Sequence, residues 1–177
     1  QSSGAIAIGY QAGAGGIGSG TQAFTYPNAQ AVNAIAIGPN SGQFAQGLSS
    51  VAIGSGAGRS NQGGSAVSIG ATFSASVGAP GSFSQGYFGI AIGSGAGQTN
   101  QSYNSVAIGN QAGYSATNAS GAVHLGYQAG YNNQGIQAVA FGKSAGVNNQ
   151  GNYAVSLGNA SGNTSQGVHS IAIGNNA

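Results

Sequence analysis

The stretch Ala5-Ile6-Ala7-Ile8-Gly9 decides the fold, because close variants of it recur along the whole chain of 177 residues. Its ten copies end at Gly9, Gly38, Gly54, Gly70, Gly93, Gly109, Gly126, Gly142, Gly158 and Gly174. Successive motif glycines are 29, 16, 16, 23, 16, 17, 16, 16 and 16 residues apart. A recurring period of this length indicates a repeat architecture, in which similar units stack on one another.

Each copy reads as a short β-strand. With the motif glycine as position 0, positions −3 and −1 hold Ile, Val, Leu or Phe, and positions −4 and −2 almost always hold Ala or Ser. Alternation at period two predicts a strand with one bulky face and one small face. The frequent glycines disfavour a helix.

The rest of the unit is rich in turn residues. Position +4 is glycine in eight copies, position −8 is Gln in nine, and position −7 is often glycine. Sixteen residues with two or three glycine corners suit one coil of a parallel β-solenoid, in which equivalent residues stack at about 4.8 Å. We therefore predict an all-β protein, a single parallel β-solenoid domain over residues 1–177 with about ten 16-residue coils.

The two faces of the strand suggest different roles. We expect the bulky face to fill the coil and the small Ala/Ser face to pack against a neighbouring chain. His124 interrupts the small face and must lie where there is room for it. The predicted core residues are Ile6, Ile8, Ile35, Ile37, Val51, Ile53, Val67, Ile69, Ile90, Ile92, Val106, Ile108, Val123, Leu125, Val139, Phe141, Val155, Leu157, Ile171 and Ile173.

The glutamines at position −8 form a second recurring column. Stacked amide side chains can bond one another along a solenoid, as they do in cross-β structures. We expect such a ladder, the alternative being that each Gln is a polar turn residue. Its members are Gln30, Gln46, Gln62, Gln85, Gln101, Gln134, Gln150 and Gln166, whereas Asn118 stands at this position in the seventh copy.

The irregular gaps locate the insertions. Extra residues fall at about 14–29 and about 71–84, and a single one falls within 115–119, always between positions +4 and −8. Insertions at one corner of a solenoid protrude on one face. Their aromatic residues predict a partner-contact surface, unless they fold back over the rod. These candidates are Phe24, Tyr26, Phe73 and Phe83.

Composition excludes several classes of function. The chain has no Asp, Glu or Cys, and its only permanently charged side chains are Arg59 and Lys143. Two cations are too few for nucleic-acid binding, and no apolar run is long enough to insert this segment into a membrane. Because almost nothing titrates, we expect stability to be nearly constant from about pH 4 to about pH 9.

The same composition argues against catalysis and metal binding. General acid–base catalysis and a Ser-His-acid triad both need a carboxylate, which is absent. His124 and His169 lie almost three coils apart, so they cannot share a metal ion within one chain. We expect no enzymatic activity, no catalytic or metal-binding residues and no cofactor. Asn100, Asn118, Asn159 and Asn163 begin N-x-(S/T) sequons, which are either chance matches or glycosylation sites.

The repeated motif (A/S)-(I/V)-A-I-G-x-x-A resembles the head domain of YadA-like trimeric autotransporter adhesins over nearly the whole chain. It is also similar to repeats in phage and large-virus fibres. The resemblance implies a left-handed β-roll, three chains side by side, and adhesion at a cell or virion surface. The neck, stalk and membrane anchor of that family do not occur in this sequence, and the near absence of charge is unusual for it.

These observations favour a non-enzymatic extracellular or virion-surface fibre protein, a rigid rod that presents loops to a host surface or matrix component. An alternative is a filament subunit whose coils stack end to end through Gln1 and Ala177. An ice-binding solenoid is a third class. It would need a regular face that orders water, but the six Thr of this chain do not recur at one repeat position. In the first two hypotheses the main partner is another copy of the chain, as a homotrimer or a polymer.

Overall fold

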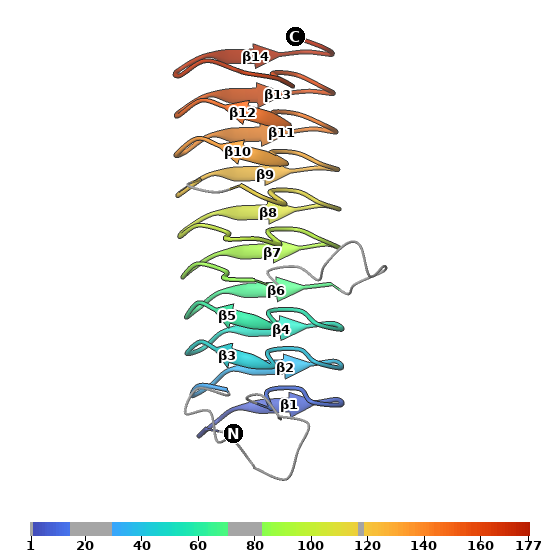
Figure 1. The fold of residues 1–177 in the computed structure, drawn as a ribbon, viewed down its shortest axis with the longest axis vertical. Coiled ribbons are helices and arrows are strands. Elements are labelled where there is room, and N and C mark those ends of the chain that lie inside the picture. The colour runs from blue at the N-terminus through green and yellow to red at the C-terminus, as the bar shows by residue number, and fades with distance from the viewer. Residues whose placement is uncertain (1, 15–29, 71–82, 117–118) are drawn as a thin grey trace.

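The computed structural model is an all-β solenoid with parallel strands stacked along one axis, as the repeat predicts (Figure 1). The structure describes residues 2–14, 30–70, 83–116 and 119–177. The predicted insertions therefore lie almost entirely outside the described residues. Within those residues no helix is long and apolar enough to cross a membrane.

Every strand is three residues long. One parallel sheet holds ten of them, in the order β1-β2-β4-β6-β7-β8-β9-β11-β13-β14. Two further parallel pairs, β3 with β5 and β10 with β12, form on the opposite wall of the coils. The bounds are β1 Ile6–Ile8, β2 Ile35–Ile37, β3 Phe44–Gln46, β4 Val51–Ile53, β5 Ser60–Gln62, β6 Val67–Ile69, β7 Ile90–Ile92, β8 Val106–Ile108, β9 Val123–Leu125, β10 Asn132–Gln134, β11 Val139–Phe141, β12 Asn148–Gln150, β13 Val155–Leu157 and β14 Ile171–Ile173.

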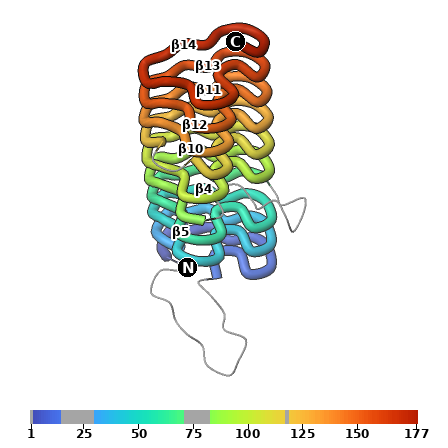
Figure 2. The backbone as a smooth tube through the Cα atoms, turned by 45° about the horizontal axis from the view of Figure 1, so that its top comes forward, coloured from blue at the N-terminus to red at the C-terminus, as the bar shows by residue number. Residues whose placement is uncertain are grey.

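The strands pair in the register that the motif predicts. Ile6 pairs with Ile35 across the 29-residue gap, and Val67 pairs with Ile90 across the 23-residue gap. The insertions thus leave the stacking of the sheet unchanged. Figure 2 shows that successive coils follow the same path along the rod.

Glycine is required at the corner that ends each sheet strand. The ten motif glycines have φ between 116° and 135°, a region that other residues rarely adopt. A Cβ atom on Gly93 would lie 2.7 Å from the carbonyl oxygen of Gly109 in the next coil. Both the backbone conformation and the close stacking of coils therefore exclude a side chain here.

The two faces of the sheet have the opposite orientation to the one that we expected. The small residues at positions −4 and −2, such as Ala91 and Ala107, are inside the coil and almost fully buried. The bulky residues at −3 and −1 lie on the outside, half-buried or exposed. The interior also holds small residues at position +3, among them Ala96 and Ala112.

The prediction of a bulky core is therefore wrong, and so is the prediction that the Ala/Ser face contacts another chain. The physical reason is space, because glutamines at position −8 cross the interior and approach the glycines at +4. Only Ala- or Ser-sized side chains fit opposite them. The residues wrongly assigned to the core are Ile6, Ile8, Ile35, Ile37, Val51, Ile53, Val67, Ile69, Ile90, Ile92, Val106, Ile108, Val123, Leu125, Val139, Phe141, Val155, Leu157, Ile171 and Ile173.

Candidate functional site: an outward apolar face and an unusual coil

The outward side of the ten-stranded sheet is an apolar surface, which we call the bulky face. It consists of the twenty Ile, Val, Leu and Phe residues at positions −3 and −1. Within it, Phe141 is 47% exposed and Leu157 is 40% exposed, although each has stacked neighbours on both sides. Because the strands are in register, these side chains form two parallel columns along the rod.

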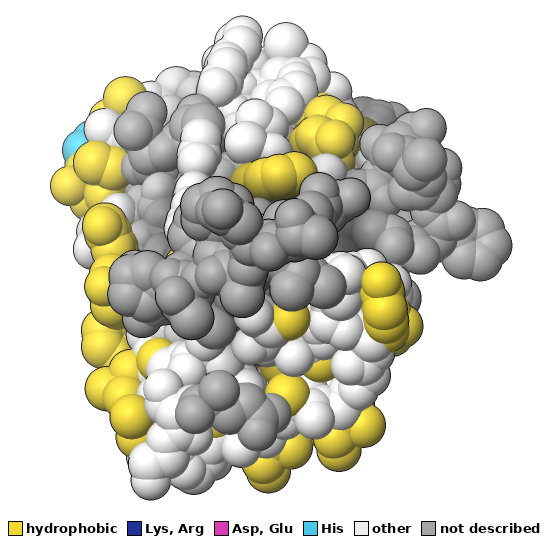
Figure 3. All heavy atoms as spheres, turned by 60° about the horizontal axis from the view of Figure 1, so that its bottom comes forward, with side chains coloured by type: hydrophobic (Ala, Val, Ile, Leu, Met, Phe, Trp, Pro, Cys, Tyr) yellow, Lys and Arg dark blue, Asp and Glu magenta, His cyan; other side chains and the backbone are white. Residues whose placement is uncertain are grey.

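Charge is absent from this face. Lys143 follows a motif glycine, and Arg59 lies at a different corner of its coil. The Arg59 guanidinium stacks on Phe44, with Cζ 5.8 Å from the ring centroid, and Nε donates to Oε1 of Gln43 at 3.2 Å. Figure 3, which brings the N-terminal end of the rod forward, shows no charged side chain on the described surface in that view.

The glutamines at position −8 do not form an amide ladder. Except in Gln134, Nε2 donates instead to backbone carbonyl groups in or next to the strands of the ten-stranded sheet. Gln62 Nε2, for example, donates to the carbonyl oxygens of Val51 at 2.8 Å and Ala66 at 3.2 Å. These acceptors are position −3 of the preceding coil and position −4 of the glutamine's own coil. The same two positions accept from Gln30, Gln46, Gln85, Gln101, Gln150 and Gln166. The expected ladder is wrong because the side chains turn inward and tie two coils together.

The other end of these amides is mostly unpaired. Oε1 of Gln46, Gln62 and Gln101 is buried and has no hydrogen-bond donor among the described residues. Where position −2 of the preceding coil is Ser instead of Ala, the oxygen is paired. Ser68 donates to Oε1 of Gln85 at 2.6 Å, and Ser156 donates to Oε1 of Gln166.

The coil that contains His124 departs from this pattern. The His124 side chain is only 1% exposed and occupies position −2, where other coils have Ala or Ser. A side chain on Gly113 would begin 2.7 Å from Nδ1 of His124, and one on Gly130 would collide with the imidazole carbons. The ring thus lies between two successive +4 glycines.

His124 replaces two glutamines. The sequence has Asn118 where other coils have Gln, and the atom nearest to a Cβ on Gly113 is Nδ1 of His124 instead of a glutamine Oε1. On its other side Gln134 is displaced, since Nε2 of Gln134 donates to the carbonyl oxygens of Asn132 and Gly146, at 2.7 Å each. The sequence shows the missing Gln and the added His, but it does not show that one compensates for the other.

Burial lowers the pKa of His124 to about 4. Nε2 of its imidazole has no hydrogen-bond partner among the described residues. An unfolded chain would instead protonate this ring near its ordinary pKa of 6.5. This difference predicts a loss of stability over the acid part of the range from pH 4 to pH 9, in place of constant stability.

Aromatic side chains form short stacks on the surface. Tyr114 and Tyr131 stack with their centroids 4.9 Å apart, as do Tyr153 and His169. Burial and the neighbouring phenols raise the pKa of Tyr131. Of the predicted partner-contact residues, Phe83 is 49% exposed, and Phe24, Tyr26 and Phe73 lie outside the described residues.

The described residues contain no group of three His, Cys, Asp or Glu side chains that could hold a metal ion. No family model, curated protein or solved structure matches the chain.

Proposed function

We propose that the chain is a non-enzymatic structural protein of an extracellular or virion-surface fibre. Copies of it associate laterally through the bulky face and form a rigid rod that attaches to a surface. The observation that carries this proposal is the orientation of the sheet, with Ala and Ser inside and the larger apolar residues outside.

Burial of apolar surface favours association through this face. Soluble monomers rarely expose large contiguous apolar patches, and larger ones usually mark interaction sites. Here each strand of the ten-stranded sheet contributes two bulky residues to the outward face, twenty in all, without a charged residue among them. A partner that covers this face removes their apolar area from water, which is the main source of binding free energy.

A second copy of the same chain has the matching surface. Its bulky residues repeat with the same spacing, so columns from parallel chains can interdigitate along their whole length. Closed cyclic symmetry is the usual arrangement of such identical subunits. The motif's resemblance to trimeric adhesin heads favours three chains over two.

Stacking supplies the stiffness that a fibre needs. Backbone hydrogen bonds join each coil to the next, such as Gly63 N–H to the carbonyl oxygen of Gln85 at 2.8 Å. The glutamine side chains add a second set of ties inside the coils. Attachment through the insertion loops or the outer coil positions would leave the bulky face free for assembly.

Light scattering of the purified protein tests the proposal. A subunit of 16.8 kDa predicts a trimer of about 50 kDa, three times that mass. Negative-stain electron microscopy should then show short rods of uniform length. Monomeric protein across the accessible concentration range would contradict lateral association, and long unbranched threads would favour the end-to-end filament instead.

A further inference from the structure

A groove runs along the outside of the coils, on a different face from the sheet. It has a volume of about 850 Å³, within the range of ligand-binding pockets. Its lining includes Gln30, Gln46, Gln62, Gln85 and Gln101, one from each of five consecutive coils. At about 4.8 Å per coil, the groove is about 19 Å long. None of the bulky-face residues lines it.

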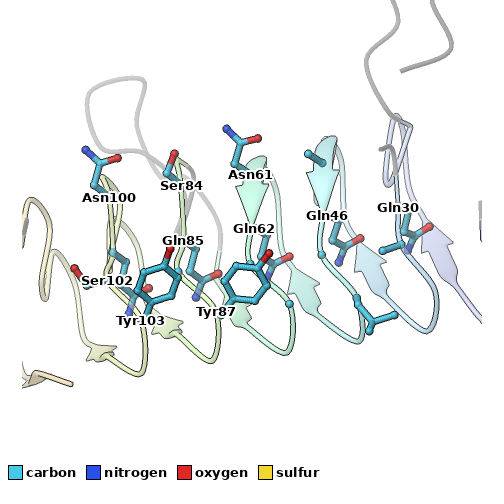
Figure 4. A pocket seen from close by; sticks show the side chains of 18 of the residues that line it. Gln30, Gln46, Asn61, Gln62, Ser84, Gln85, Tyr87, Asn100, Ser102 and Tyr103 are labelled. Carbon is cyan, nitrogen blue, oxygen red and sulfur yellow. The ribbon is translucent and has the colours of Figure 1, made fainter. Parts of the chain in front are cut away.

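The two rims of the groove differ in chemistry. One rim carries Asn61, Ser84 and Asn100, whose exposed side chains stand on residues with φ of 51° to 55°. The other rim carries Leu48, Tyr87 and Tyr103, each more than half exposed. Figure 4 shows the Asn and Ser side chains on one side of the glutamines and the two Tyr rings on the other.

Small residues keep the floor between these rims low. Position −7 is glycine at Gly47, Gly63 and Gly86, and a Cβ atom on Gly63 would lie 2.5 Å from the amide nitrogen of Tyr87. Close stacking of the coils thus requires glycine at this position, and the absence of side chains there leaves the floor of the groove open. Gly64 also interrupts the aromatic rim between Leu48 and Tyr87.

Toward the described residues, the polar rim groups have unused hydrogen-bonding capacity. The side chains of Asn61, Ser84 and Asn100 make no hydrogen bond to another described residue. At the same repeat position outside the groove, Asn133 donates to Asn149 at 3.2 Å, so that pair is joined along the rod. The groove therefore differs from that pair in offering amide and hydroxyl groups to a ligand.

Backbone groups of the floor are already used. Gly63 N–H donates to the carbonyl oxygen of Gln85 at 2.8 Å, and Gly86 N–H donates to that of Gln101 at 2.7 Å. An extended peptide that binds as an added strand needs free backbone groups, which this floor does not offer. Recognition has to come from the side chains.

We infer that the groove binds a neutral, unbranched oligosaccharide of several sugars, lying along the rod axis. Sugar hydroxyl groups match the Asn, Ser and Tyr donors and acceptors, and the apolar C–H faces of sugar rings match Leu48 and the Tyr rings. No charged residue lines the groove, so a charged ligand would lose hydration without an opposite charge in return.

This inference names the ligand for surface attachment within the proposed function, and the two can fail separately. The groove does not include the bulky face, so sugar binding and oligomer mass are independent measurements. A trimer that binds no sugar would remove only the groove proposal. A monomer that binds sugar would remove only the lateral assembly.

Titration by NMR or calorimetry with cellohexaose, maltohexaose and chitohexaose tests the groove directly. At least one of these neutral hexasaccharides should bind with a dissociation constant between about 10 µM and about 5 mM, since the groove is open. A sulfated heparin hexasaccharide and an uncharged ten-residue peptide should bind at least tenfold more weakly. Absence of binding by all three neutral sugars, or tighter binding of the peptide or of heparin, would overturn the inference.

Substitutions in the two rims test whether the oligosaccharide binds in this groove. The double variant Tyr87→Ala/Tyr103→Ala should weaken it at least tenfold, with Tyr127→Ala, an exposed Tyr outside the groove, as the control. Asn61→Gly/Asn100→Gly keeps the backbone conformation and should weaken binding about fivefold, with Asn149→Gly as its control. Unchanged affinity in folded Asn variants, judged by circular dichroism, would overturn the inference even if the Tyr variant fails to fold.

Discussion

The Ser68 hydroxyl donates to Oε1 of Gln85 across 2.6 Å inside the solenoid, and this bond pairs an oxygen that most other coils leave unpaired. Ser68→Ala should therefore destabilise the protein by about 1–3 kcal/mol, the usual cost of a buried polar atom that loses its partner. Chemical denaturation measures this change. The control is Ser55→Ala, at a corner position whose side chain makes no hydrogen bond to another described residue, and it should have little effect.

Ala91 offers the converse test. It holds the same position in its coil as Ser68, and Oε1 of Gln101 beside it is unpaired. Ala91→Ser should stabilise the protein by about 0.5–1.5 kcal/mol through a new hydrogen bond. Ala91→Val should destabilise it by about 1–3 kcal/mol, because the coil interior has no room for two more methyl groups. Equal tolerance of Ser and Val in denaturation experiments would contradict the assignment of this face to the interior.

His124 should make stability depend on pH. Its folded pKa of about 4 lies below the ordinary value of 6.5, so the unfolded chain binds more protons between these values. Stability is then fully present above about pH 6.5 and falls as the pH is lowered to about 4, by about 3 kcal/mol in total. Urea denaturation at several pH values measures this loss.

Two variants assign that pH dependence to one ring. Asn118→Gln/His124→Ala restores the residues that other coils carry, and it should remove most of the slope. Ser68→Ala changes the interior without removing a titratable group, so it should lower stability without changing the slope. A slope that survives in the first variant would show that His124 is not its source.

The motif glycines should differ sharply from glycines with ordinary backbone angles. Gly93 has φ of 119°, and a Cβ atom there would meet the backbone of Gly109. At Gly64 the nearest atom would be Cδ1 of the Tyr87 ring, 3.2 Å away, which can shift. Gly93→Ala should therefore cost several kcal/mol, and Gly64→Ala about 1 kcal/mol or less. Similar melting temperatures for the two variants would contradict this distinction.

The sequence predicts much of the fold because every strand of the ten-stranded sheet carries the same alternating motif, whereas the short strands β3, β5, β10 and β12 on the opposite wall do not carry it. The strand positions in that sheet, its parallel register and the glycine corners all follow from the motif, and the structure confirms them. Alternation alone does not say which face is inside. That depends on the opposite wall of the coil, where Gln62 and its equivalents occupy the interior and leave room only for small residues.

The candidate sites are less accessible from sequence. The groove forms because Asn61 and Tyr87 lie on opposite sides of a corner of the coil. The positive φ of Asn61 orients its side chain, and no sequence motif indicates that φ. The sequence shows that Asn118 stands where other coils have Gln and that His124 stands where they have Ala or Ser. The meaning of this exchange depends on knowing that the His124 side chain points into the coil.

Lateral association through the bulky face is the central claim, and the mass of one variant tests it most directly. Val106 and Ile108 lie on the bulky face of β8, near the middle of the rod. Val106→Lys/Ile108→Lys should place two charges in each subunit's interface while leaving the coil interior intact. The control is Asn110→Lys, which adds one charge at an exposed position beyond the motif glycine.

Light scattering should give about 50 kDa for the wild type and for Asn110→Lys, and the subunit mass of 16.8 kDa for the double lysine variant. Far-ultraviolet circular dichroism should show β-structure in all three. A double lysine variant with the wild-type mass, or a wild type that is already monomeric, would contradict the claim that the outward Ile, Val, Leu and Phe residues hold the chains together.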